Sequence, residues 1–156
     1  MDILDEELLK LWKLFHQHDV EYIVVGGFAV NLYGHSRTTD DLDLWIKDSL
    51  ENRKKIRLVL EALNNRDFKA IETMDFVPGW SAIRLDSGFE IDIMTFMSGF
   101  TQEQFDDCFQ YAEIGLINEI PLRFLHYSHL IKSKKAAGRP KDMLDIDELE
   151  KINKQS

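Results

Sequence analysis

One stretch of the sequence, residues 24–46, limits strongly how the chain can fold. It reads VVGGFAVNLYGHSRTTDDLDLWI: an apolar run, a glycine pair, a short apolar segment, and then alternating acidic and aliphatic residues. Side chains two positions apart in a β-strand lie on the same face of the sheet. We therefore expect Asp41 and Asp43 on one face of a strand, with the intervening leucines directed into a core.

The two carboxylates would repel each other, and nothing in a simple strand requires them to be there. A shared divalent cation makes such a pair favourable, because hard cations such as Mg²⁺ prefer carboxylate oxygens. Gly26 and Gly27 precede this pair. A glycine pair alone most often marks an ordinary turn, but glycines also let a backbone approach a ligand and offer its N–H groups to an anion. Together, the glycines and the acidic pair indicate a site for a metal ion and a phosphorylated ligand.

This arrangement resembles the nucleotidyltransferase superfamily of the DNA polymerase β type, in which a Gly-Gly or Gly-Ser turn precedes an acidic-x-acidic strand. The finer pattern, GGFAVNLYGHSRTTDDLDLWI, is similar to small bacterial nucleotidyltransferases that include toxin-like members of abortive-infection systems. The resemblance covers most of the chain. It implies an α+β fold: a polymerase-β-like palm with a mixed β-sheet flanked by helices, followed by C-terminal helices.

The resemblance also implies roles for individual residues. Gly26 and Gly27 match the glycine pair and would bind the phosphates of a nucleotide. Arg37 matches a basic residue just before the acidic strand, where it would contact phosphate or brace that strand. Asp41 and Asp43 match the metal-binding pair.

A second acidic strand is expected in a β-hairpin formed by residues 80–85 and 89–96, which are separated by Asp-Ser-Gly. If Leu85 pairs with Phe89, Arg84 faces Glu90 and gives that carboxylate an ion-pair partner. Asp92 then faces only a small alanine, which leaves room beside it. In the family that this chain resembles, a third carboxylate comes from such a strand, so Asp92 is assigned as a catalytic and metal-binding residue.

The third informative stretch is a basic segment near the C-terminus. A basic end suits the dipole of a helix, and it could also contact a triphosphate or an RNA backbone. The resemblance favours phosphate contact, with Lys134 as the first candidate. Lys141 is a second candidate, and it and Asp142 could instead brace two helices. The segment places five basic residues in ten positions, which are Lys132, Lys134, Lys135, Arg139 and Lys141.

Hydrophobic periodicity, capping residues and turn signals predict the remaining elements. The chain is expected to form one domain, residues 1–156, with a core of about 20–97 and a C-terminal helical part of about 125–153. Ser49 is expected to cap the helix that follows it. Helices are predicted over residues 3–17, 28–33, 50–64, 126–137 and 141–153, with a short helix after Thr101, and strands over 21–25, 41–46, 68–72, 80–85, 89–96, 111–117 and 120–124.

Composition limits the partners of the chain. Its formal net charge of -9 makes strong binding to DNA unexpected, because nucleic-acid affinity comes mostly from neutralising phosphates. The single cysteine allows no intrachain disulfide, which fits a reducing cytosol. The acidic N-terminus is unlike a signal peptide, and no apolar run is long enough to span a membrane, so a cytoplasmic location without membrane contact is expected.

The expected function is transfer of a nucleoside monophosphate from a nucleoside triphosphate (NTP) to an acceptor hydroxyl, with release of pyrophosphate. The resemblance implies two Mg²⁺ ions, with Mn²⁺ as a substitute, and leaves the acceptor open among tRNA, a protein and a small molecule. It also suggests a toxin that is paired with an antitoxin. The alternatives are a catalytically silent nucleotide-binding or regulatory partner of the same fold, and a metal-dependent phosphatase or nuclease that uses the same carboxylates.

Overall fold

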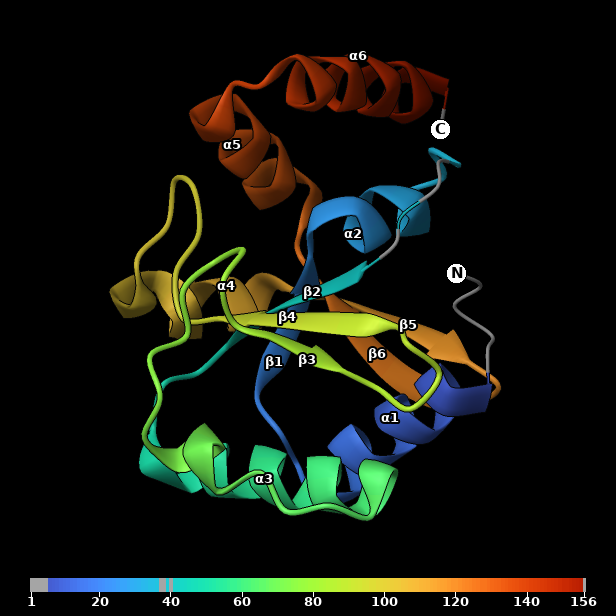
Figure 1. Ribbon diagram of the computed structural model, residues 1–156. Coiled ribbons are helices and arrows are strands. Elements are labelled where there is room, and N and C mark those ends of the chain that lie inside the picture. Colours follow the sequence, from blue (N-terminus) through green and yellow to red (C-terminus); the bar gives the residue numbers. More distant parts are fainter. Residues whose placement is uncertain (1–5, 37–38, 40, 156) are drawn as a thin grey trace.

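The computed structural model describes residues 6–36, 39 and 41–155, and these form a mixed arrangement of helices and strands (Figure 1). The α-helices are α1 (Glu6–Gln17), α2 (Gly26–Leu32), α3 (Leu50–Asn64), α4 (Phe105–Tyr111), α5 (Tyr127–Ala137) and α6 (Pro140–Gln155). The strands are β1 (Tyr22–Val25), β2 (Asp41–Ile46), β3 (Ala82–Arg84), β4 (Glu90–Met94), β5 (Glu113–Ile117) and β6 (Ile120–Phe124). Two 3₁₀ helices, η1 (Lys69–Glu72) and η2 (Gln102–Gln104), complete the set.

The strands form one six-stranded mixed sheet in the order β3-β4-β2-β1-β6-β5. β2 lies between β1 and β4. It runs antiparallel to β1 and parallel to β4. β3 and β4 form one antiparallel hairpin and β5 and β6 form another. The expected mixed sheet is therefore present, the predicted hairpin of residues 80–85 and 89–96 is confirmed, and the strands predicted over 111–117 and 120–124 pair as a second hairpin.

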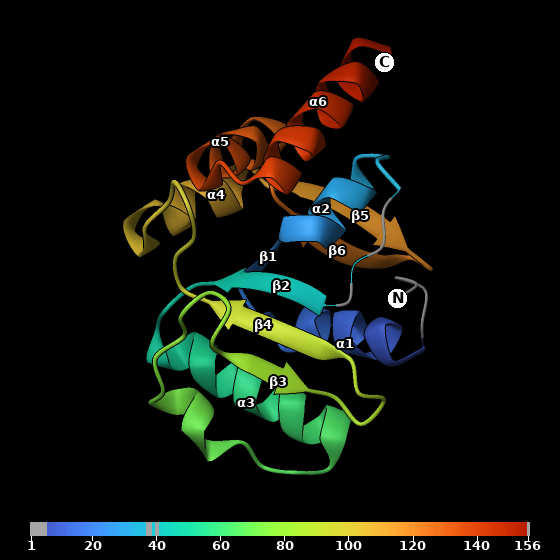
Figure 2. The same cartoon turned by 45° about the horizontal axis from the view of Figure 1, so that its top comes forward.

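Helices cover the two faces of the sheet unequally. α1 and α3 pack against each other on one face, and α2 lies against β1 and β2 on the other (Figures 1 and 2). α5 and α6 stand beyond α2 as a helical pair, in the place where the sequence predicted C-terminal helices. The core contains the fully buried indoles of Trp12 and Trp45. No helix of the described residues is both long and apolar enough to cross a membrane.

The predicted alternation in β2 is confirmed. Leu42 and Leu44 have no exposed surface, whereas Asp41 is exposed and Asp43 is half-buried. The strand has the predicted bounds, 41–46. This strand is short and its polarity alternates strictly, so only one register buries its leucines.

Helix α3 also has its predicted bounds, and the Ser49 side chain accepts a hydrogen bond from the N–H of Asn52, as expected of an N-cap. The strand predicted over residues 68–72 is wrong, because this segment forms η1. Arg53, on α3, donates to the backbone carbonyls of Ile71 and Met74. These two hydrogen bonds tie the segment to α3. Its backbone carbonyls therefore have partners without pairing to a strand of the sheet.

Candidate active site

Two neighbouring strands bring the predicted carboxylates together. Because β2 and β4 are parallel and in register, Asp43 lies beside Asp92 and Asp41 lies beside Glu90. The hairpin has the predicted pairing, in which Ala82 faces Asp92 and Arg84 forms an ion pair with Glu90 at 2.7 Å. Glu90 thus has a local partner, and the remaining three carboxylates share one face of the sheet.

The glycine pair lies directly against this face. β1 ends at Val25 and α2 begins at Gly26, whose φ of +67° is in the left-handed region that favours glycine. A Cβ at this position would lie 2.2 Å from Oδ2 of Asp43. Gly26 therefore lets the backbone turn into α2 while it remains in contact with the acidic strand.

Asp92 is buried, with 6% of its surface exposed, and its two oxygens differ in their contacts. Oδ2 accepts a hydrogen bond of 2.7 Å from the N–H of Gly79. Oδ1 is buried without a hydrogen-bond partner among the described residues. Burial raises the pKa of Asp92, and the Gly79 hydrogen bond opposes that effect only in part.

The surroundings of Asp43 strongly raise its pKa. Burial, followed by the nearby charges of Asp41 and Asp92, raises the pKa of Asp43 from 3.8 to about 7. The positive charges of Lys134 and Lys141 oppose this shift. The carboxylates therefore destabilise one another, as expected for groups that are suited to a cation.

The junction between α5 and α6 carries the basic residues of the site. α5 ends at Ala137 and is capped by Gly138, which adopts the left-handed conformation, and α6 begins at Pro140, a residue well suited to the first position of a helix. Asp142, in the first turn of α6, accepts hydrogen bonds from the backbone N–H of Arg139 at 3.1 Å and from its Nε at 2.7 Å. The junction therefore holds the Arg139 guanidinium at a fixed place.

Lys134 is more deeply buried than the sequence suggested. It is only 6% exposed, and its Nζ lies 3.3 Å from Oδ1 of Asp142 and 3.0 Å from Oδ2 of Asp145. Burial acts to raise the pKa of Asp142, but the hydrogen bonds from Arg139 and the charge of Lys134 lower it overall. Lys134 thus joins α5 to α6 as well as lining the pocket described next.

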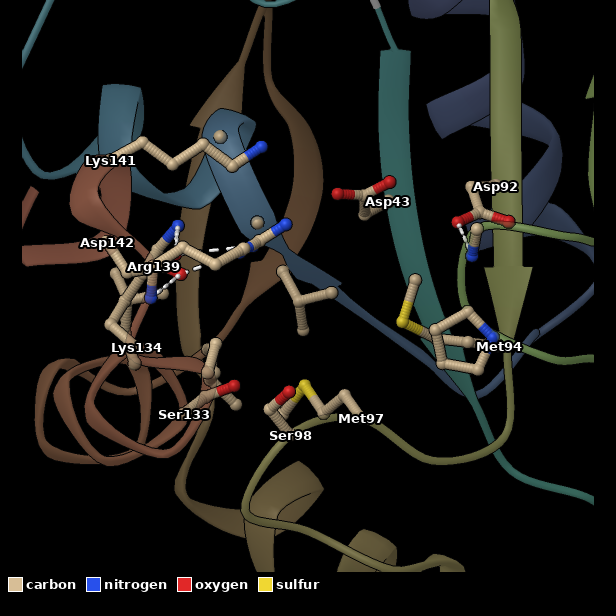
Figure 3. A pocket seen from close by; sticks show the side chains of 18 of the residues that line it. Asp43, Asp92, Met94, Met97, Ser98, Ser133, Lys134, Arg139, Lys141 and Asp142 are labelled. Atoms are coloured by element: carbon tan, nitrogen blue, oxygen red, sulfur yellow. Dashed lines mark hydrogen bonds and ion pairs between the residues drawn. The ribbon is translucent and has the colours of Figure 1, made fainter.

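A pocket of about 640 Å³ separates the carboxylates from these basic residues (Figure 3). Asp43 and Asp92 stand on one side of it, and Lys134, Arg139 and Lys141 stand on the other. The same pocket is lined by Gly26, Gly27, Asp41, Met94, Met97, Ser98 and Ser133, among others.

The pocket brings together seven of the eight residues that the sequence predicted for the site, while Arg37 lies outside the described residues. Sequence reasoning did not select Arg139 as a site residue, although it noted the basic segment that contains it. Its position between a helix-ending glycine and a proline was the available signal.

The side chains on the acidic side are of the type that hard cations prefer, and the unpartnered Oδ1 of Asp92 is a buried acceptor for which a cation would supply a partner. In the described part of the chain, however, no three His, Cys, Asp or Glu side chains are already grouped as a metal site. The donors thus fit a divalent cation in their chemistry and in their shared face of the sheet.

The repulsion among the carboxylates predicts an effect of Asp43→Asn on stability. The folded-state pKa of about 7 lies above the ordinary 3.8, so ionisation favours the unfolded chain, and this destabilisation grows from about pH 4 to 7. At pH 8 in EDTA, the variant should exceed the wild type in free energy of unfolding by about 1–2 kcal/mol. Mg²⁺ should raise the melting temperature of the wild type more than that of the variant. A variant less stable than the wild type in EDTA, or equal shifts with Mg²⁺, would contradict this expectation.

The buried ion pairs of the α5–α6 junction predict a second effect. Asp142→Ala should lower the free energy of unfolding by about 3 kcal/mol, because it leaves a buried lysine with one carboxylate fewer. The matched control is Asp147→Ala, at an exposed position of the same helix, for which we expect a change below about 0.5 kcal/mol. Urea denaturation measures both values, and equal losses would show that the junction does not depend on Asp142.

Comparisons with known proteins give a consistent picture. A family described as a nucleotidyltransferase of unknown function (DUF6036) matches residues 1–156. The structure resembles that of a candidate nucleotidyltransferase from Thermotoga maritima, with a TM-score of 0.52 and 13% identity over 96% of this chain and 91% of that one. It also resembles an antigenic nucleotidyltransferase-like protein from Paracoccidioides brasiliensis, with a TM-score of 0.51 and 18% identity over 91% and 71% of the two chains. No curated protein matches the sequence significantly.

Proposed function

Because the chain belongs to the DUF6036 family of nucleotidyltransferases and has a polymerase-β-like nucleotidyltransferase fold, we propose that it transfers a nucleoside monophosphate from an NTP to an acceptor hydroxyl. The observation that carries this proposal is the division of charge across one pocket. Carboxylates suited to divalent cations face basic side chains suited to phosphates. An NTP with its metal ions needs both kinds of group: carboxylates to hold the metal ions, and basic side chains to hold the phosphates.

The triphosphate would lie against the basic side of the pocket. Arg139 and Lys141 offer charged donors there, and Gly26 and Gly27, which line the same space, would offer their backbone N–H groups. Lys134 adds positive charge from its buried position between the two helices. Phosphoryl-type transfer requires in-line positioning of the reactants and neutralisation of charge. These groups would supply both without forming a covalent bond to the substrate.

Asp41, Asp43 and Asp92 would hold the divalent cations. Two bound Mg²⁺ ions, or Mn²⁺ in their place, would neutralise the phosphates and stabilise the attacking and leaving oxygens. Gly26 would fix the Asp43 carboxylate by close contact. The Gly79 N–H would fix Asp92 and leave its second oxygen available.

The proposed step forms one bond and breaks one. The acceptor oxygen attacks the α-phosphorus, the bond from that phosphorus to the α–β bridging oxygen breaks, and pyrophosphate leaves. The acceptor proton would pass to the Asp92 carboxylate, which shares the face of Asp41 and Asp43.

The test is a mass-resolved assay with each NTP and Mg²⁺, with and without total tRNA. The proposal expects pyrophosphate release that depends on Asp43, and a nucleotide-sized increase in the mass of the acceptor. Orthophosphate release would instead support a phosphatase. If an NTP binds and no acceptor mixture gives turnover, the silent nucleotide-binding alternative replaces the proposal.

A further inference from the structure

The loop that leads into β3 contacts one of the three carboxylates. The Gly79 N–H donates a hydrogen bond of 2.7 Å to Oδ2 of Asp92, which Figure 3 shows beside the pocket. Oδ1 of Asp92 has no hydrogen-bond partner among the described residues. The terminal torsion of an aspartate side chain has broad preferences, so an external contact has to fix the plane of the carboxylate. The orientation of Asp92 therefore depends on the path of this loop.

A buried hydroxyl closes the same loop. Ser81 is only 3% exposed, and its Oγ accepts a hydrogen bond of 2.8 Å from the Val77 N–H and donates one of 3.0 Å to the Asp75 carbonyl. The hydroxyl is thus satisfied as a donor and as an acceptor inside residues 75–81, here called the 75–81 loop. Gly79 lies within the segment that these bonds close. The Ser81 hydroxyl therefore sets where the Gly79 N–H points.

The ends of the 75–81 loop are held by other contacts. The Ile93 N–H donates to the Ser81 carbonyl at 3.1 Å, and the Thr95 N–H donates to the Phe76 carbonyl at 3.3 Å. Phe76 is also buried in the core. With its ends fixed in this way, the loop can lose the Ser81 hydroxyl while the sheet still forms. A variant that lacks this hydroxyl should therefore change the middle of the loop more than the sheet.

We propose that Ser81 is a positioning residue for a divalent cation bound at Asp92. Through the 75–81 loop it directs the Gly79 N–H at Oδ2, and this contact fixes the carboxylate in the orientation in which it meets the cation. The inference rests on the proposed function, because that function assigns the cation to Asp92. Groups that hydrogen-bond to the ligands of a metal ion raise its affinity about 10- to 100-fold. Ser81 acts through one further hydrogen bond, so we expect an effect near the lower end.

Binding of Mn²⁺ to the full chain, followed by electron paramagnetic resonance, tests the proposal without any turnover. Ser81→Ala should bind Mn²⁺ about tenfold more weakly than the wild type, whereas Ser81→Thr, which keeps the hydroxyl, should stay within about threefold. The matched control is Ser87→Ala, the same change in the exposed turn between β3 and β4, whose hydroxyl donates to Glu7. It should bind as the wild type does. Wild-type affinity in Ser81→Ala, or equal losses in Ser81→Ala and Ser81→Thr, overturns the proposal.

A double-mutant cycle separates positioning from a general loss of structure. Asp92→Ala removes the carboxylate through which Ser81 acts and leaves Asp41 and Asp43 to bind Mn²⁺. In this background, Ser81→Ala should change the affinity less than about twofold, because the effects of coupled residues are not additive. A tenfold loss in both backgrounds would show that Ser81 acts on the whole site and not through Asp92, and would overturn the proposal.

Activity assays distinguish failure of this proposal from failure of the proposed function. In nucleotidyl transfer, Ser81→Ala should raise the Mg²⁺ concentration for half-maximal rate about tenfold and leave kcat at saturating Mg²⁺ within about threefold. If pyrophosphate is released and Ser81→Ala has the wild-type Mg²⁺ requirement, the proposed function stands and the positioning role is wrong. If no NTP gives pyrophosphate with any acceptor, but Ser81→Ala weakens Mn²⁺ binding only when Asp92 is present, the proposed function fails and the positioning role stands.

Discussion

Asp43→Asn should lower the rate of nucleotidyl transfer at least about a thousandfold while leaving the fold intact. Asp43 lies beside Asp92 on the neighbouring strand, and Gly26 contacts its carboxylate. Asparagine keeps the shape of the side chain but removes the charge that a divalent cation requires. Burial and the neighbouring carboxylates disfavour the negative charge of Asp43. The variant lacks this charge, so it should fold at least as well as the wild type.

Asp41→Asn should have an effect of the same kind, because Asp41 lies on the same face of β2. The matched control is Asp147→Asn, an identical change at an exposed position of α6. Pyrophosphate release under saturating NTP measures all three variants, and circular dichroism checks their folding. Wild-type turnover in either Asp41→Asn or Asp43→Asn would refute the assignment of this pair.

Gly26→Ala is expected to have the second large effect. Its Cβ would be placed 2.2 Å from Oδ2 of Asp43, so the carboxylate or the start of α2 has to move. Displacement of a catalytic group by about 1 Å can lower a rate about a hundredfold, and we expect a loss of at least this size. The left-handed backbone at Gly26 adds about 1–2 kcal/mol of destabilisation.

Gly88→Ala separates these two effects. Gly88 also has a positive φ, of +92°, but an added Cβ there would meet nothing within 4 Å. Both variants should therefore lose the stability that backbone strain costs, Gly26→Ala should lose more because of its contact with Asp43, and only Gly26→Ala should lose transfer activity. If Gly88→Ala were as inactive as Gly26→Ala, backbone strain and not contact with Asp43 would explain the loss.

The sequence predicted those parts of the fold that depend on local pattern. The bounds of β2 and α3 follow from strict alternation and from a capping serine, and both lie where they were expected. The β3–β4 register follows from the short loop, which pairs Leu85 with Phe89 and so places Arg84 opposite Glu90. The family resemblance implied Asp92 as the third carboxylate, and the parallel pairing of β2 with β4 in the structure places it beside Asp43.

Contacts between distant segments could not be predicted in this way. The segment of residues 68–72 has the composition of a strand, and donors from Arg53 on α3 hold it as a 3₁₀ helix. The burial of Lys134 depends on how α5 meets α6, and periodicity along one helix does not contain that information. Asp142, three residues further on, sets the orientation of Arg139 locally, but the place of Arg139 across the pocket from the carboxylates depends on how α5 and α6 lie relative to the sheet.

The most direct test of the central claim uses NTP labelled either at the α-phosphate or at the γ-phosphate, in parallel reactions with Mg²⁺ and an acceptor mixture. Nucleotidyl transfer predicts that the α-label becomes attached to the acceptor and the γ-label appears in pyrophosphate, both only with Asp43 present. A γ-label attached to the acceptor, or released as orthophosphate, would contradict the proposed function and assign this pocket to a different phosphoryl-transfer reaction.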